Sequence, residues 1–177
     1  MISHQCDQSP FIAGVSAAFG VPPLMVLFSM IGFGSLASSQ HLDLLNTLFA
    51  AAAIYGMPGQ IAMLELQATG ASTLAVVVGV SLANMRFLPM TVVLMPLFTV
   101  NDPWYRLRFV VVQALSINSW THCRELLPGL DANSRMGFFA GFAALCFLGG
   151  LIGTGMGWLL ASTLPAVITL VLSLIHI

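Results

Sequence analysis

The sequence predicts an all-α membrane protein, a polytopic bundle of transmembrane helices interrupted by proline and glycine. Of its 177 residues, 58% are hydrophobic and only 6% are charged, whereas ordinary soluble domains carry roughly 25% charged residues. Long apolar runs also recur along the chain, and a run of about 20 residues is enough to cross a hydrocarbon core of about 30 Å. These observations place the chain in a membrane.

Four apolar segments are long enough to span, namely residues 11–38, 44–66, 71–98 and 136–164. A weaker segment, 107–127, turns polar after Leu115, so it is either a fifth span lined with polar groups or an interfacial or re-entrant helix. We expect a span. The connections are short and no linker rich in Ser or Pro divides the chain, which predicts a single transmembrane domain over residues 1–171.

The ends of the chain carry two further expectations. The first residues lack the basic region of a signal peptide, so we expect the first apolar segment to be retained. The last six residues, LSLIHI at 172–177, read like the translation of a transposase sequencing adapter. We therefore expect a non-native tail on a chain that is truncated before its remaining helices.

Charge and cysteine usage exclude several classes of function. Five basic residues, all arginine, face six carboxylates, so there is no basic patch for nucleic acid. Cys6, Cys123 and Cys146 are odd in number, far apart and outside any metal-ligand spacing. We expect no disulfide framework, no metal, no cofactor and no nucleic-acid partner.

The position of Arg86 is the feature of this sequence that most calls for a functional explanation. It lies deep in the segment 71–98, where thirteen Leu, Val or Phe residues offset the insertion cost of about 2.5 to 3.5 kcal/mol for a central Arg. Asn84 is two residues away and so points to a different side of a helix. Polar groups on two sides predict a helix enclosed by others or lining a wet cavity. The alternative is a structural Arg held by free carbonyls or by Glu65.

Prolines predict broken helices near this arginine. Pro22 and Pro23 free the carbonyls of Ala18 and Phe19, and Pro58 and Pro89 free those of Ile54 and Met85. Backbone that is freed at membrane depth is tolerated where it is buried in protein or borders a cavity, and transporters bind substrates at such breaks. Simple kinks are the alternative.

Two distant segments of the chain are similar. FIAGVSAAF at 11–19 and FFAGFAALC at 138–146 share four of nine residues, which either an internal repeat or chance explains.

Residues 54–94, IYGMPGQIAMLELQATGASTLAVVVGVSLANMRFLPMTVVL, resemble the core of the AzlC family, the large subunits of bacterial branched-chain amino acid exporters. That family carries an A-G-A-x-Q segment and then an N/D-x-R-H motif in the next helix. Gly56, Gly59 and Gln60 match the first, and Asn84 and Arg86 match the second. The looser similarity extends over residues 11–171.

The resemblance implies a multi-pass protein of the bacterial inner membrane that exports valine and similar amino acids. It implies a small AzlD-type membrane subunit as partner, with membrane lipid around both. We expect the substrate-binding or pathway residues to be Gly56, Pro58, Gly59, Gln60, Asn84 and Arg86, with Met63 nearby to accept the substrate side chain.

Two departures from the family pattern put energy coupling in doubt. The family's His after the Arg is Phe87 here, and its Thr-Asp-Glu appears as Ser116-Ile117-Asn118. A non-transporting assembly subunit is therefore a second hypothesis. An intramembrane enzyme is a third, although no nucleophile elbow or oxyanion motif accompanies Ser119 and His122, and we expect no enzyme.

Overall fold

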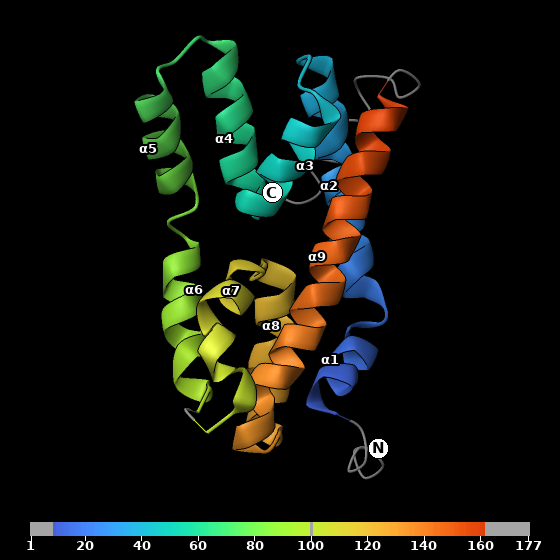
Figure 1. The fold of residues 1–177 in the computed structure, drawn as a ribbon, viewed down its shortest axis with the longest axis vertical. Coiled ribbons are helices and arrows are strands. Elements are labelled where there is room, and N and C mark those ends of the chain that lie inside the picture. The colour runs from blue at the N-terminus through green and yellow to red at the C-terminus, as the bar shows by residue number, and fades with distance from the viewer. Residues whose placement is uncertain (1–8, 100, 162–177) are drawn as a thin grey trace. The chain divides into compact units, whose positions relative to one another are not determined.

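A computed structural model describes residues 9–99 and 101–161. In these residues the chain is all α-helical, without strands, as the composition predicts. The α-helices are α1 (Pro10–Ala18), α2 (Val21–Ser39), α3 (Leu44–Ala53), α4 (Met57–Ala68), α5 (Thr73–Ala83), α6 (Phe87–Leu94), α7 (Arg108–Gln113), α8 (Ile117–Leu126) and α9 (Arg135–Leu160) (Figure 1). Short 3₁₀-helices are η1 (Met95–Leu97), η2 (Pro103–Leu107), η3 (Leu127–Gly129) and η4 (Ala132–Ser134).

The chain groups into two compact units. Unit 1 contains Met1–Pro23 and Phe87–Phe147, and unit 2 contains Leu24–Arg86 and Leu148–Ile177. The expected single domain stays a prediction. The expected non-native tail, 172–177, lies outside the described residues.

Proline placement explains where the helices break. In the described residues every proline lies within the first three residues of an α- or 3₁₀-helix. The N–H groups of a first turn have no partner within the helix, so proline starts a helix there without losing a hydrogen bond. The prolines therefore begin new helices rather than kink continuous ones. Between α1 and α2, Gly20 has φ +151°, in the region that favours glycine.

Unit 2 is held together by close helix packing. A Cβ on Gly34 of α2 would overlap the Thr154 carbonyl of α9, and a Cβ on Gly157 of α9 would overlap the Ile31 carbonyl of α2. Each glycine thus lets the other backbone approach, as small residues do between membrane helices. The Trp158 indole N–H of α9 donates to the Leu42 carbonyl at 2.8 Å, which ties α9 to the α2–α3 turn.

Unit 1 repeats this reciprocal arrangement between α1 and the first part of α9. A Cβ on Gly14 would overlap the Phe138 carbonyl, and a Cβ on Gly141 would overlap the Phe11 carbonyl. These are corresponding positions in the two similar segments of the sequence. Phe139 and Phe142, in the same part of α9, are fully buried.

A loop in unit 1 is fastened by one carboxylate and one guanidinium. Asp102, 3% exposed, accepts from the Trp104 N–H through Oδ1 and from the Met136 N–H through Oδ2, both at 2.9 Å. It caps η2 and the start of α9 together. Arg135 donates to the carbonyls of Leu97, Pro128 and Leu130.

Fewer segments are continuous spans than the hydropathy predicts. Among the described residues, α2 and the segment Ala132–Leu160 are long and apolar enough to cross a membrane, and Thr73–Ala83 with Phe87–Leu97 is a third if counted as one broken span. Residues 44–66 form two helices. The expected span at 107–127 is wrong as a continuous helix: α7 and α8 have six and ten residues, or about 9 and 15 Å at 1.5 Å per residue.

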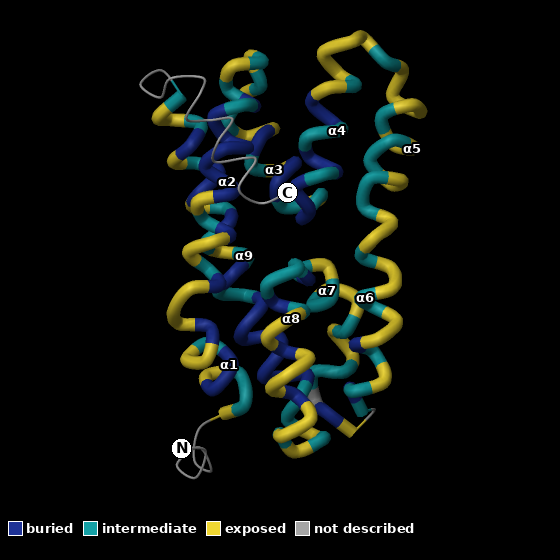
Figure 2. Tube along the Cα trace, turned by 180° about the vertical axis from the view of Figure 1, so that it is seen from behind, coloured by how far each residue is buried: buried dark blue, intermediate teal, exposed yellow. Residues whose placement is uncertain are grey.

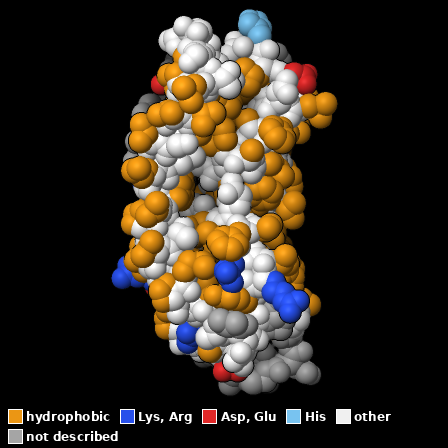
Figure 3. All heavy atoms as spheres, turned by 60° about the vertical axis from the view of Figure 1, so that its left-hand side comes forward, with side chains coloured by type: hydrophobic (Ala, Val, Ile, Leu, Met, Phe, Trp, Pro, Cys, Tyr) orange, Lys and Arg blue, Asp and Glu red, His pale blue; other side chains and the backbone are white. Residues whose placement is uncertain are grey.

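The long helices contain buried residues, whereas α5 does not. Figure 2 shows buried positions along α2, α9 and the start of α4, whereas α5 has none. Within the described residues α5 is thus not enclosed by other helices, and the alternative expectation, that it lines a wet cavity, stays a prediction. Figure 3 shows apolar side chains over much of one face and few charged side chains, and ionisable residues are rare within membrane segments.

Candidate functional site

The centre of the candidate site is the break between α3 and α4 in unit 2. Helix α3 ends at Ala53 and α4 begins at Met57, because the ring of Pro58 would collide with the Ile54 carbonyl in a continuous helix. Gly56 at the junction is extended, with φ −170° and ψ 114°, and no side chain caps the start of α4. The first-turn N–H groups of α4 are thus left to other partners.

The carbonyl that Pro58 frees has a new partner. The Ile54 oxygen accepts the Gly56 N–H at 2.7 Å and the Gln60 side-chain Nε2 at 2.8 Å. This second bond fixes the Gln60 amide, which is 0% exposed, with its nitrogen toward the backbone. The Gln60 Oε1 consequently points elsewhere.

Asn84 joins the site through the packing of α4 on α5, which lie side by side (Figure 1). A short turn with Gly70 at φ +70° connects them, and Gly79 of α5 makes room for Leu66 of α4. Farther from the turn, the Asn84 amide lies so close to Gly59 that a Cβ there would overlap it. Three of the predicted site residues, Gly59, Gln60 and Asn84, are therefore brought together.

Two side-chain oxygens at this place are buried without a hydrogen-bond donor. They are Gln60 Oε1 and Asn84 Oδ1. Leaving a buried polar atom without a partner costs about 1 to 3 kcal/mol, and such an atom in a native structure calls for an explanation, for instance a ligand. Met63, 7% exposed, lies one turn further along α4 and adds an apolar surface.

Arg86 differs from the other predicted residues. It follows the α5 C-cap residue Asn84 by two positions, and its side chain is exposed. An exposed cation bears less desolvation cost than a buried one. The structure thus places Arg86 in the same unit as Gln60 and Asn84 but not in the buried part of the site.

The α7–α8 break in unit 1 is built differently. Ser116 and Ser119 form a capping box, in which the Ser116 hydroxyl accepts the Ser119 N–H at 3.1 Å and the Ser119 hydroxyl accepts the Ser116 N–H at 2.8 Å. This reciprocal bonding satisfies the first turn of α8. The start of α4, in contrast, has no side-chain cap.

The sequence did not predict the contact of Asn84 with Gly59. Its signal was present, because two antiparallel helices joined by a short turn place residues at equal distances from the turn opposite each other. Leu66 lies opposite Gly79 in this way, and Gly59 lies opposite Asn84.

The fold and the site define a class: a helical membrane protein with paired short helices and a polar site at one uncapped helix start. The family model described as AzlC protein matches residues 23–164, and the chain therefore belongs to the AzlC family, a transporter-type family associated with branched-chain amino acids. The match covers the α3–α4 break and Asn84. Neither a curated protein nor a solved structure matches the chain.

Proposed function

We propose that this chain is the large subunit of an exporter of branched-chain amino acids. In this proposal it works as a multi-pass protein of the bacterial inner membrane together with a small AzlD-type membrane subunit. The observation that carries the proposal is the pair of buried, unpartnered oxygens of Gln60 and Asn84 beside the uncapped start of α4.

A zwitterionic amino acid supplies both the hydrogen-bond donors that the two amide oxygens lack and the negative charge that the start of α4 favours. The ammonium group of an amino acid donates hydrogen bonds, which Gln60 Oε1 and Asn84 Oδ1 can accept. Its carboxylate favours the N-terminus of a helix, where N–H groups and the macrodipole attract negative charge. Apolar Met63 suits a branched aliphatic side chain.

Arg86 has a role in this proposal while the substrate approaches the site. An exposed guanidinium attracts a carboxylate from a distance and pairs with it in a bidentate manner. In this proposal Arg86 receives the carboxylate, and the start of α4 holds it while the ammonium group meets the amide oxygens.

The test is efflux of preloaded valine and leucine from cells or proteoliposomes that contain the full chain and its partner subunit. Gln60→Leu keeps the approximate side-chain size and removes the acceptor. We expect it to lower export by about tenfold to hundredfold, since a hydrogen bond to a charged group is worth about 1.5 to 3 kcal/mol. Gln67→Leu, on the exposed side of the same helix, is the matched control and should export normally.

Binding of analogues tests the orientation separately. Isobutylamine lacks the carboxylate and isovalerate lacks the ammonium group. Gln60→Leu should weaken binding of isobutylamine and leave binding of isovalerate unchanged. Saturable efflux that is equal in Gln60→Leu and Gln67→Leu would contradict this site, and absence of saturable efflux in the unaltered pair would favour the assembly subunit instead.

A further inference from the structure

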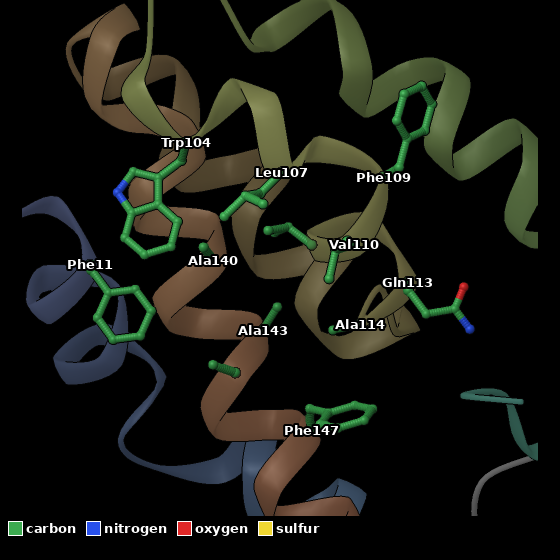
Figure 4. Close-up of a pocket in the computed structure, with 12 residues that line it drawn as sticks. Phe11, Trp104, Leu107, Phe109, Val110, Gln113, Ala114, Ala140, Ala143 and Phe147 are labelled. Carbon is green, nitrogen blue, oxygen red and sulfur yellow. The ribbon is translucent and has the colours of Figure 1, made fainter. Parts of the chain in front are cut away.

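A groove of about 670 Å³ opens in unit 1 between α1, η2, α7 and α9. In Figure 4, Phe11 and Trp104 lie on one side, Leu107 and Val110 lie on the other, and α9 runs between them with Ala140 and Ala143. The Phe11 and Trp104 rings are stacked with centroids 5.4 Å apart. Small residues on α9 thus form a floor between bulkier walls.

The lining of this groove is hydrocarbon almost throughout. Gln113 is the one amide among the lining residues, and its polar end points away from the space in Figure 4. An amino acid would have to leave its charged groups without partners here, at a cost of several kcal/mol per ion. The groove therefore suits an apolar chain.

The size of the groove argues against a helix as its occupant. A helix with side chains is about 10 to 12 Å wide, so a volume of this size holds only about 6 to 8 Å of it, or four to six residues. A flexible acyl chain is much thinner and can follow the groove.

Cations flank the groove on η2 and α7. The Arg108 guanidinium lies 4.3 Å from the centroid of the Tyr105 ring and 4.8 Å from that of Phe109, and Phe109 lines the groove. Arg106, on the same short segment, is exposed. The carboxylate of this loop, Asp102, is 3% exposed and accepts two backbone N–H groups. Two arginines therefore stand against one buried carboxylate, and the exposed charge of the segment is positive.

Aromatic side chains mark the level at which a headgroup would sit. Trp104 and Tyr105 directly precede Arg106, and Trp and Tyr are enriched where the hydrocarbon core meets the headgroups. We propose that the groove binds an anionic phospholipid from the bilayer, with an acyl chain between Trp104 and Val110 and the phosphate at Arg106 and Arg108.

Native mass spectrometry of the purified full chain tests this proposal with dioleoyl phosphatidylglycerol and dioleoyl phosphatidylcholine, which share their acyl chains and differ in net charge. We expect tighter binding of phosphatidylglycerol, by about fivefold for each arginine that contacts the lipid, and a smaller preference at high salt. The double variant Arg106→Gln/Arg108→Gln should abolish the preference. Arg124→Gln, which removes an exposed arginine of α8 in the same unit, should retain it.

Filling the groove tests the acyl-chain half of the proposal. Ala144 lines the groove, and Ala144→Phe should weaken binding of both lipids. Leu148→Phe, at an exposed residue of α9 that does not line the groove, should not. If Ala144→Phe fails to fold, Val110→Trp serves the same purpose, because Val110 lines the groove and is 72% exposed. Equal binding of the two lipids by the unaltered chain, or unchanged lipid binding in a folded groove-filling variant, overturns the proposal.

Discussion

The side-chain amide of Asn84 lies directly against Gly59, at a position where any larger residue would overlap it. This contact joins the first turn of α4 to the end of α5. It also brings the unpartnered Asn84 Oδ1 to the residue next to Gln60, whose Oε1 is likewise unpartnered. Gly59 is therefore needed for space rather than for backbone freedom.

Replacing that glycine should disturb the site. Gly59→Ala should displace the Asn84 amide and lower both valine export and thermal stability, the latter by about 1 to 3 kcal/mol as for other overpacked positions. Efflux and tryptophan-monitored unfolding in detergent measure the two effects. In Gly59→Ala/Asn84→Ala the overlap is relieved, so stability should recover while export stays low. Equal stability of the single and double variants would contradict the contact.

The exposed arginine tests the approach of the substrate. Arg86→Gln should abolish efflux of preloaded valine or leucine, because the carboxylate loses its charged partner, while membrane insertion and melting temperature stay unchanged. Lower insertion or a lower melting temperature together with normal efflux per inserted molecule would assign Arg86 to helix packing instead.

The crossing of α2 and α9 offers a matched pair of glycines. A Cβ at Gly157 would overlap the Ile31 carbonyl, whereas a Cβ at Gly155 would meet nothing within 4 Å. Gly157→Ala should therefore cost about 1 to 3 kcal/mol of stability. Gly155→Ala should be neutral or stabilising by up to about 1 kcal/mol, because alanine favours the helix more than glycine does. Unfolding curves of the two variants measure the difference, and similar curves would argue against this crossing.

Asp102 should matter for stability through its two backbone bonds. Asp102→Asn leaves one acceptor oxygen for two N–H groups and removes a negative charge from the start of α9. We expect a loss of about 1 to 2 kcal/mol. Asp131→Asn is the control, since Asp131 is exposed and its side chain makes no cap bond. Thermal unfolding compares them, and equal melting temperatures would exclude the double cap.

Much of the fold could be predicted because hydropathy and proline act locally. Few charges and long apolar runs place the chain in a membrane, and Pro58 frees the Ile54 carbonyl wherever the helix lies. Hydropathy alone failed for residues 44–66 and 107–127, which it assigns to continuous spans, although Pro58 did predict the break in the first of them. Backbone and cap bonds at Gly56 and Ser116 divide them into shorter helices, and hydropathy does not register such bonds.

The sequence by itself determined the class of protein, the helix breaks that depend on proline and the motif residues Gln60, Asn84 and Arg86. Only the tertiary structure decided how those residues differ. It buried Gln60, set Asn84 on Gly59 across the α4–α5 turn and left Arg86 exposed. The reason is physical: a helix break depends on neighbouring residues, whereas a contact between residues 59 and 84 depends on how two helices pack after the chain has turned.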